Sequence, residues 1–527
     1  MDPDLQSALT VAARHGPKDP VSGRAGVIVT SHPVATRVGA DTLRSGGNAC
    51  DAALAAAITQ TVVEPQMTSI AGMMKLVYFD ASSGKTRWLS GAHRATAAAL
   101  DRLNNKTVNS GMGVALPGWW GAFDEAREHL CTKSRRELMQ PAIELARNGA
   151  IVYPELYGVM YRRVAELGAS EAGREMFFDR RVRLRAPGER LDQRQAAETL
   201  DRLADEGSDF FYRGEFAEGF CGLVASIGGV ISPDDMAGYI APWADPVGGS
   251  YRGHRILASG APDGGLNIIE ALNMVETLDP AAYAPPAESP EFLSDLMLIC
   301  QDIIDRGAGW RDPMTMPDAT EAIVSKEYAE ARIQLLRMAG AHRGIVAPHV
   351  GTDHISAVDS DGNVAVLMHT CTGDPWLNGL FYRGVQVPNS MGWAMRTPVK
   401  PGARITIDGA ENIALIDGRP VLGSGSPSGS LLPCVLQNMI NIIDFGMPLQ
   451  TSVAQPRFGF TAAGSSRLVV EANVDPKVLD RLRQLGMPFD VVTPYYEHMG
   501  SYDAVHRVGD DWTACGDPRR GGAAEAV

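Results

Sequence analysis

A threonine that follows a glycine and opens an alternating polar and apolar run has the clearest chemical potential in this sequence. The run Thr352–Asp359 alternates as a half-buried strand does, and Asp361-Gly362-Asn363 is typical of the turn that closes a hairpin. A threonine hydroxyl is a weak nucleophile unless a base lies beside it. The α-amino group freed by cutting the chain before Thr352 can be that base. The pattern fits a self-cleaving enzyme, but taken alone it favours a threonine that merely opens a strand.

A glycine- and serine-rich loop is the second candidate for chemistry. Gly423–Ser430 precedes a predicted helix, Leu431–Phe445, and free backbone N–H groups at the start of a helix can hold an anion. The loop lacks the lysine of a phosphate loop and the spacing of a dinucleotide loop. It is therefore predicted to form either an oxyanion pocket or a helix cap built from small residues.

The histidines show no metal-binding spacing. His349 and His354 flank Thr352, while His93 and His369 lie elsewhere, and the sequence has no HExxH motif or paired Cys/His motif. These side chains are predicted to be structural, and the sequence implies no metal and no cofactor.

Helical patterns dominate the first two-thirds of the chain. Helices are expected at Val34–Ser45, Ala49–Val63, Trp120–His129, Arg136–Asn148, Ala196–Asp205, Glu215–Ser226, Gly265–Glu276, Glu291–Arg306 and Lys326–Met338. Short strands are expected among them at Gly26–Thr30, Leu76–Phe79, Arg87–Ser90 and Tyr251–Ala258.

Strands come first after the Gly340–Gly351 linker. They are expected at Asp353–Asp359, Val364–Thr370, Arg404–Asp408 and Asn412–Ile416, ahead of the long helix named above. Strands followed by helices that must cover them favour a layered α/β architecture over parallel βαβ repeats.

Composition and charge exclude several classes of protein. A net charge of −14 over 527 residues argues against nucleic-acid binding, which needs clustered cationic side chains. No run of about 18 apolar residues is present, so no membrane span is expected. The acidic start Met1–Gln6 is unlike a secretory signal, and the seven dispersed cysteines suit reduced thiols. We expect a soluble cytoplasmic protein.

Segments in order along nearly the whole chain resemble the gamma-glutamyltranspeptidase family of N-terminal nucleophile hydrolases, from about Gly26 onward. The matching motifs are Val27–Thr36, Gly46–Ala53, Val62–Met67, Ala115–Gly118, Pro262–Gly265, Asp305-Arg306, Asp312-Pro313, the Thr352/His354/Ser356 pattern, Gly425–Ser430 and Ala454–Phe458.

The resemblance implies a four-layer αββα sandwich and self-cleavage between Gly351 and Thr352. A large fragment, 1–351, and a small fragment, 352–527, would then form one fold. Thr352 would be the nucleophile and Thr370, on the adjacent strand, its hydrogen-bond partner. The N–H groups of Ser428 and Gly429 would form the oxyanion hole, although Ser428 stands where the family usually has glycine.

The family residues that read a γ-glutamyl group are replaced here. Its carboxylate-binding Arg-Glu pair corresponds to Ala92-His93, with Arg94 close by. The remaining correspondences are Thr372 for an asparagine, Ile407-Asp408 for paired serines, and Ser390 with Gly392 or Trp393 for the glutamine and acidic residue that recognise the ammonium. His93, Arg94 and Thr372 are therefore the candidate substrate-binding residues, and Asp353 either tunes the nucleophile or caps the strand.

The sequence thus predicts an amidohydrolase for a small non-γ-glutamyl amide, most like the family's oxamate amidohydrolases of purine catabolism. Its expected partners are that small-molecule amide and the two fragments of one precursor, which could pair further as a dimer of heterodimers. Three alternatives stay open: a true glutathione hydrolase or γ-glutamyltransferase, an acylase, and an uncut, non-catalytic binding or scaffold relative.

Overall fold

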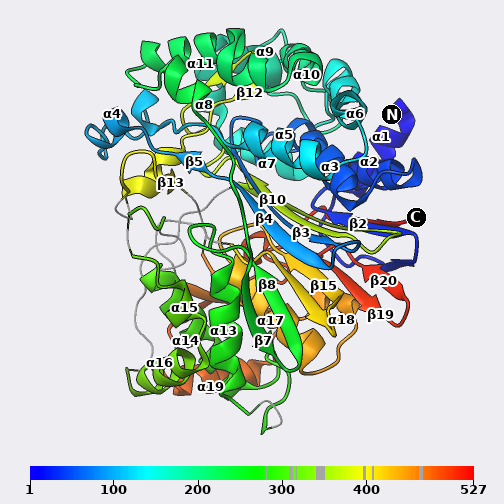
Figure 1. Cartoon of the computed structure of the whole chain (residues 1–527), viewed down its shortest axis with the longest axis vertical. Helices are drawn as coiled ribbons and strands as arrows, with labels where there is room; N and C mark the ends of the chain where they lie inside the picture. Colours follow the sequence, from blue (N-terminus) through cyan, green and yellow to red (C-terminus); the bar gives the residue numbers. More distant parts are fainter. Residues whose placement is uncertain are drawn as a thin grey trace.

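Two seven-stranded sheets lie face to face, and helices cover the outer face of each (Figure 1). The computed structural model describes residues 1–279, 282–307, 312–315, 317–339, 351–395, 399–405, 409–461 and 467–527, and these sheets are the large ones within those ranges. The arrangement confirms the four-layer αββα sandwich predicted from the sequence.

The first sheet has the order β21-β2-β9-β10-β3-β4-β6, with every neighbouring pair antiparallel. Its strand β9, which begins at the candidate nucleophile, lies between β2 and β10. The strands are β2 (Gly26–Thr30), β3 (Met73–Asp80), β4 (Lys85–Gly91), β6 (Trp243–Ala244), β9 (Thr352–Asp359), β10 (Val364–Thr370) and β21 (Ala523–Ala526).

The second sheet has the order β1-β20-β19-β15-β14-β8-β7 and is also antiparallel. Its strands are β1 (Val21–Gly23), β7 (Val247–Tyr251), β8 (His254–Ala258), β14 (Asn412–Ile416), β15 (Arg419–Gly425), β19 (Asp503–Val508) and β20 (Asp511–Ala514). Three small sheets pair β5 (His93–Arg94) with β13 (Arg404–Ile405), β11 (Phe381–Tyr382) with β12 (Val385–Gln386), and β16 (Phe458–Phe460), β17 (Leu468–Glu471) and β18 (Phe489–Val492).

Helices of the N-terminal half cover the first sheet, as the upper part of Figure 1 shows. They are α1 (Pro3–Ala12), α2 (Pro33–Arg44), α3 (Ala49–Val63), α4 (Ala97–Leu100), α5 (Trp119–Leu130), α6 (Arg135–Asn148), α7 (Pro154–Arg162), α8 (Val164–Ala169), α9 (Glu171–Phe177), α10 (Arg194–Glu206), α11 (Glu215–Ser226) and α12 (Pro233–Ala237). Helix α3 packs against β9 and β10, and nearly all of its residues are buried because α2, α5 and α6 cover its other sides.

A second group of helices covers the other sheet. They are α13 (Leu266–Glu276), α14 (Pro290–Arg306), α15 (Thr320–Ile323), α16 (Lys326–Ala339), α17 (Leu431–Ile443), α18 (Leu449–Ala454) and α19 (Pro476–Gln484). Among them, α13 packs on β7 and β8, and α17 packs on β15. None of the described helices is both long enough and apolar enough to span a bilayer.

The space between the sheets is filled by β-branched and aliphatic side chains, among them Val77, Val358, Val366 and Ile413. Such residues suit a pleated surface packed from above. The second face of the first sheet packs on α3, so β9 is buried at every position. The prediction of a half-buried strand at Thr352–Asp359 is therefore wrong: both faces of this strand are covered, and its polar side chains point into the interior.

Most predicted elements match the observed ones within two residues. Two strands differ by more. Strand β3 begins at Met73, three residues before the predicted Leu76–Phe79, and Tyr251–Ala258 is the last residue of β7, the turn and the second strand of the hairpin β7–β8. Arg252 and Gly253 make that turn with φ of 47° and 81°. Of the predicted strand Arg404–Asp408, β13 accounts for the first two residues, and 406–408 lie outside the described residues.

Candidate active site

Thr352 opens β9 at the centre of the first sheet, with its side chain fully buried. The antiparallel register pairs it with Thr370, the last residue of β10. The hydroxyl of Thr352 donates a hydrogen bond to Oγ1 of Thr370 at 3.2 Å. Cross-strand neighbours of this kind are the closest side chains in a sheet, so the ladder itself brings the two predicted threonines together.

The peptide bond before Thr352 is held beside these hydroxyls. The hydroxyl of Thr370 donates to the carbonyl oxygen of Gly351, and the N–H of Gly351 donates to the carbonyl of Gly373 at 3.4 Å. A Cβ on Gly351 would lie 2.6 Å from the carbonyl oxygen of Gln66, so a side chain does not fit there. The carbonyl carbon of Gly351 therefore lies next to the Thr352 hydroxyl, and its oxygen already accepts a hydrogen bond from Thr370.

A chain of hydroxyls continues from Thr370 to His93. The N–H of Thr372 donates to Oγ1 of Thr370 at 2.8 Å, and the hydroxyl of Thr372 donates to Oγ of Ser390 at 3.0 Å. Oγ of Ser390 lies 2.9 Å from Nε2 of His93, whose Nδ1 lies 3.1 Å from the carbonyl oxygen of Leu116. Every side chain in this chain is buried.

The carbonyl of Leu116 fixes the proton on His93. A carbonyl oxygen only accepts, so Nδ1 carries the hydrogen and Nε2 accepts from the hydroxyl of Ser390. Burial lowers the pKa of His93 to about 4, so the ring is neutral at pH 7. His93 thus orients the hydroxyls of Ser390 and Thr372 and brings no positive charge.

Thr372 itself has a strained backbone. Its φ of 57° falls in the left-handed region, which β-branched residues rarely adopt, and Nε1 of Trp393 donates to its carbonyl at 3.1 Å. Trp393 belongs to the short 3₁₀ segment η5 (Ser390–Met395), which also supplies Ser390. Strain held in place by neighbouring contacts is typical of functional sites.

Arg94 lies next to His93 but is turned away from this chain. Its Nη2 donates to the carbonyl of Ile240 at 2.9 Å, and its guanidinium lies 5.4 Å from the centroid of the Tyr239 ring. Of the three predicted substrate-binding residues, the structure brings His93 and Thr372 together and leaves Arg94 apart. Ile407 and Asp408 lie outside the described residues.

The predicted oxyanion loop begins beside β9. A Cβ on Gly425, the last residue of β15, would lie 2.2 Å from Nε2 of His354, so the two strands touch two residues from Thr352. Beyond it, Ser428 has a φ of 89°, and its hydroxyl donates to the carbonyl of His498 at 3.0 Å.

The backbone N–H groups of Ser428 and Gly429 donate to no other group within the described part of the chain. Two free donors at a helix start can stabilise a negative charge. The φ of Ser428 also accounts for the glycine that the family usually has at this position, because glycine adopts that conformation without steric cost.

Arg520 contacts Thr352, the candidate nucleophile, and the sequence did not single it out. Its Nη1 donates to the carbonyl oxygen of Thr352 at 2.8 Å and lies 3.7 Å from a carboxylate oxygen of Asp353. The Asp517–Arg520 segment carries no pattern that predicts this contact, because it follows from the C-terminal chain folding back to form β21.

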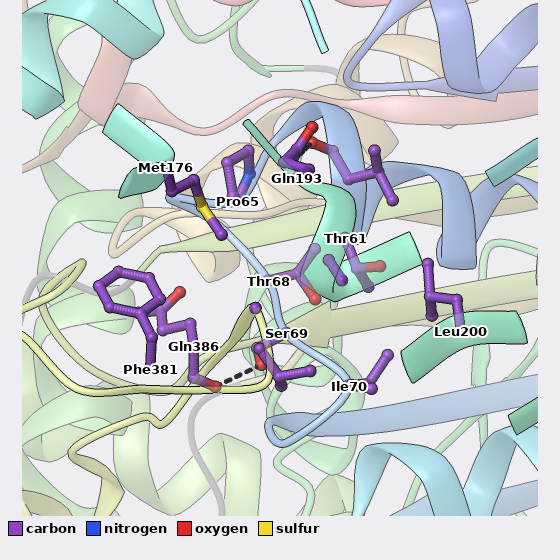
Figure 2. Close-up of a pocket in the computed structure, with 14 residues that line it drawn as sticks. Thr61, Pro65, Thr68, Ser69, Ile70, Met176, Gln193, Leu200, Phe381 and Gln386 are labelled. Atoms are coloured by element: carbon purple, nitrogen blue, oxygen red, sulfur yellow. Dashed lines mark hydrogen bonds between the residues drawn. The ribbon is translucent and has the colours of Figure 1, made fainter. Parts of the chain in front are cut away.

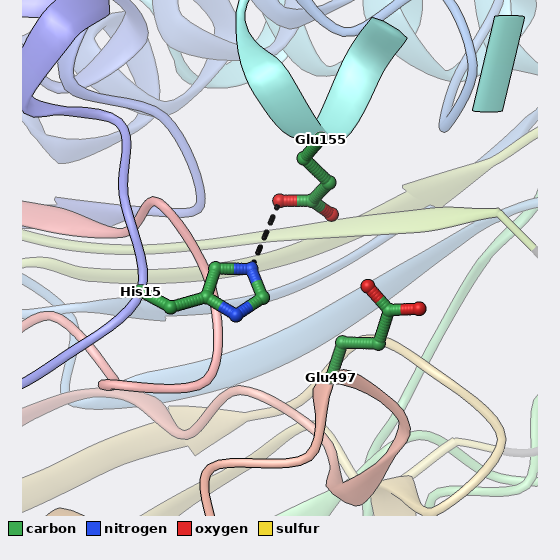
Figure 3. A group of neighbouring side chains, drawn as sticks. All are labelled: His15, Glu155 and Glu497. Atoms are coloured by element: carbon green, nitrogen blue, oxygen red, sulfur yellow. Dashed lines mark ion pairs between the residues drawn. The ribbon is translucent and has the colours of Figure 1, made fainter. Parts of the chain in front are cut away.

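A cavity of about 80 Å³ adjoins Arg520 and also has Met67, Asp374 and His498 in its wall. At its edge, His15, Glu155 and Glu497 turn their polar groups toward one another, with Nε2 of His15 3.6 Å from Glu155 (Figure 3). Hydrogen bonding to Glu155 raises the pKa of His15, which favours the charged form of the ring beside these carboxylates. The expected absence of a metal stays a prediction.

A second, smaller cavity of about 30 Å³ lies behind the Pro65–Ile70 loop (Figure 2). It is walled by residues such as Met176, Leu200 and Phe381, and by none of the predicted site residues. Its size suits a single water molecule.

The chain matches a family description over nearly all of its length: residues 35–527 fit the family described as Gamma-glutamyltranspeptidase. The acylase ACY 1 proenzyme of Pseudomonas sp. (strain SE83) is 30% identical over 475 residues, which cover 84% of this chain and 83% of the relative. The glutathione hydrolase proenzyme of Escherichia coli (strain K12) is 28% identical over 544 residues, covering 95% and 91%.

Solved structures agree with this assignment. The cephalosporin acylase of Bacillus halodurans, at 24% identity, superposes with a TM-score of 0.84 over 97% of each chain and has the same fold. The gamma-glutamyltranspeptidase of Helicobacter pylori, at 26% identity, gives a TM-score of 0.54 over 58% of this chain and 90% of its own. The sequence match over residues 35–527 and the shared sandwich together establish that this chain belongs to the gamma-glutamyltranspeptidase family of N-terminal nucleophile hydrolases, which act on amide and peptide C–N bonds.

Proposed function

We propose that this chain is a self-processing amidohydrolase for a small amide without a γ-glutamyl group, and that its substrate is oxamate, which it hydrolyses to oxalate and ammonia. The observation that carries the proposal is the buried hydroxyl chain from Thr352 through Thr370, Thr372 and Ser390 to a neutral His93. Relatives that read a γ-glutamyl group are expected to have an asparagine at Thr372, a glutamine and an acidic residue at Ser390 and Gly392 or Trp393, and an Arg-Glu pair at Ala92-His93.

Self-processing starts from the contacts around Gly351. The Thr352 hydroxyl attacks the carbonyl carbon of Gly351, while Thr370 donates to the carbonyl oxygen. The peptide C–N bond breaks, the acyl group passes to Oγ1 as an ester, and the hydroxyl proton passes to the nitrogen of Thr352. Water then releases the carboxylate of Gly351. The products are the fragments 1–351 and 352–527, the second with a free α-amino group on Thr352.

Turnover reuses the same hydroxyl. The α-amino group takes its proton as Oγ1 attacks the substrate amide, and the N–H groups of Ser428 and Gly429 stabilise the oxyanion. Each such donor is worth about 3–4 kcal/mol in measured hydrolases. Ammonia leaves with the proton from the α-amino group, and water hydrolyses the ester on Thr352.

Substrate choice follows from the polar groups beside the nucleophile. A γ-glutamyl ammonium bound without its usual partners loses charge-assisted hydrogen bonds worth about 1.5–3 kcal/mol each. We assign the hydroxyl of Thr372 to the carboxylate of the small substrate: when substrate binds, it donates to that carboxylate instead of to Ser390, whose own hydroxyl keeps its bond to His93. Arg94 is left out of this assignment because its guanidinium is engaged by Tyr239 and Ile240.

We also propose a metabolic role, a cellular location and an assembly for the enzyme. A role in purine catabolism and a cytoplasmic location suit the proposed substrate and the seven dispersed cysteines. The two fragments would pair into a dimer of heterodimers.

An acylase is the second candidate, because a relative named acylase is 30% identical over 84% of this chain. An acylase needs room for a larger acyl group, whereas oxamate does not. A glutathione hydrolase and an uncut binding protein are the remaining candidates.

Substrate profiling of the purified protein separates these functions. We expect ammonia and oxalate from oxamate, at a rate well above p-nitroaniline release from a γ-glutamyl anilide or amine release from long-chain acyl amides. Faster release from the γ-glutamyl anilide would make the chain a glutathione hydrolase, and faster release from acyl amides would make it an acylase.

A further inference from the structure

Arg520 is the buried cation nearest to the proposed nucleophile that the reaction outlined above does not use. The residue is 4% exposed, and its Nη1 lies 2.8 Å from the carbonyl oxygen of Thr352. Its Nε has no hydrogen-bond partner within the described residues. Burying a guanidinium with one N–H donor unpaired costs free energy. The contacts that its other donors make therefore need a structural or functional explanation.

The sheet explains why a side chain is required at this position. Strand β2 pairs with β9 only from Thr30 opposite Ile355 to Gly26 opposite Asp359. Thr352 therefore extends beyond the end of β2, and on that side no strand among the described residues pairs with it to donate to its carbonyl. Arg520 supplies a donor there, from the segment that leads into β21 on the far side of β2.

Buried carboxyl groups lie close to Arg520. Asp353 is fully buried, and its oxygens accept no hydrogen bond from the described residues; one of them lies 3.7 Å from Nη1 of Arg520. Burial raises the pKa of Asp353 well above its usual range, with the negative charge of Glu64 adding to the effect. Arg520 thus holds both the carbonyl of Thr352 and the side chain that follows it.

We propose that Arg520 is a positioning residue: by holding the carbonyl of Thr352, it fixes the direction in which the hydroxyl and the new α-amino group of that residue point. Backbone scission removes the N-terminal anchor of Thr352, which is the Gly351 N–H bond to Gly373. Rotation about the Cα–C bond would then swing both reactive groups, and the contact with Arg520 opposes that rotation. The inference rests on the proposed role of Thr352 as nucleophile.

The test measures acylation of Thr352 by p-nitrophenyl acetate. Oγ1 attacks the ester carbonyl, p-nitrophenolate leaves, and the hydroxyl proton passes to the α-amino group. For Arg520→Ala we expect the rate of acylation at saturating ester to fall about ten- to hundred-fold, the loss of one hydrogen bond from a charged donor, with little change in the half-saturating concentration. Arg162→Ala is the matched control, because Arg162 lines the same cavity without touching Thr352.

Chemical rescue separates positioning from general stability. Arg520 borders the cavity of about 80 Å³, so its truncation opens a path for a small cation. We expect millimolar methylguanidinium to restore acylation of Arg520→Ala saturably, and neutral urea to leave it unchanged. A wild-type rate in Arg520→Ala would overturn the proposal. So would a loss of rate that methylguanidinium leaves uncorrected and that accompanies a lowered melting temperature.

Two further measurements keep the outcome unambiguous. If Arg520→Ala does not fold, Arg520→Lys decides. A lysine keeps the charge but lacks the planar fork, so a reduced rate supports the proposal and a wild-type rate contradicts it. Peptide mapping locates the acetyl group. Wild-type protein that is not acetylated on Thr352 would refute the nucleophile, whereas acetylation there with no effect at Arg520 would refute only the positioning role.

Discussion

His93 and Arg94 are neighbours in the sequence, yet only one of them reaches the hydroxyl chain. His93 accepts from Ser390, while Arg94 lies against Tyr239. We expect His93→Ala to lower kcat/KM for a small carboxylate-bearing amide about ten- to hundred-fold, because Ser390 and Thr372 lose the acceptor that orients them. Arg94→Ala should change it less than about three-fold. Steady-state kinetics of both variants checks this, and equal losses would contradict it.

Glu64 makes the stability of the folded protein depend on pH. Burial, with the negative charge of Glu155 adding to it, raises the pKa of Glu64 to about 7. Between its ordinary value near 4.5 and about 7, the folded protein keeps a proton that the unfolded chain has lost. The contribution of Glu64 to the free energy of unfolding therefore falls as pH rises through this window, and it no longer changes above the window.

Glu64→Gln removes this titration. We expect the variant to gain stability relative to the wild type as pH rises from 5 to 7.5, by on the order of 1–3 kcal/mol. Thermal melting over that range measures the difference. Parallel curves for the two proteins would show that Glu64 does not titrate in the folded state.

The sequence predicted the identities of the threonines but not their surroundings. Thr352 could be found because a glycine precedes it and a strand starts there, whereas Thr370 was singled out only by the resemblance to the family. Arg520 could not be found, since it lies 168 positions from Thr352 and meets it only after the C-terminal strand has joined the sheet. The neutral state of His93 follows from burial and from the carbonyl of Leu116, which no local pattern records.

At the scale of elements, the loop before β3 holds the end of β10 in place. A Cβ on Gly72 would lie 2.3 Å from the carbonyl oxygen of Thr370 and 2.8 Å from that of Ser69, both main-chain atoms. Gly72→Ala must therefore move the strand that carries the Thr370 hydroxyl. We expect slower self-cleavage and a loss of about 1–3 kcal/mol of stability.

Gly222→Ala is the matched control for this change. Gly222 lies in α11, and a Cβ there has no atom within 4 Å. This variant should cleave as the wild type does and melt at the same or a slightly higher temperature, because alanine favours a helix. Gels of the cleavage time course, with melting curves, compare the two variants. Self-cleavage of Gly72→Ala at the wild-type rate would show that the loop before β3 does not position Thr370.

Periodicity predicted the existence of the elements better than their burial. The ranges of α3, α11, β2, β10 and β14 match the sequence prediction residue for residue. The alternation in β9 predicted one solvated face, but a sheet enclosed between α3 and a second sheet has none. Strand β15, which delivers the predicted oxyanion loop, was not anticipated, because its Gly423-Ser424-Gly425 end has neither alternation nor β-branched side chains.

At the scale of the molecule, the proposed cut separates the chain without separating the fold. Strands β9 and β10 of the small fragment lie between β2 and β3 of the large one, and β21 pairs with the other edge of β2. The buried ion pair of Lys75 with Glu411, at 2.9 Å, also joins the two fragments across the facing sheets. The two proposed fragments therefore form one shared core, and we expect them to migrate together on gel filtration.

Intact-mass spectrometry of the purified protein, paired with that of Thr352→Ala, tests whether the chain cuts itself before Thr352. We expect a small fragment whose first residue is Thr352 in the wild type. In the variant, which lacks the hydroxyl, we expect only the full-length chain and no hydrolytic activity. A full-length wild-type chain together with unchanged turnover in Thr352→Ala would contradict this expectation.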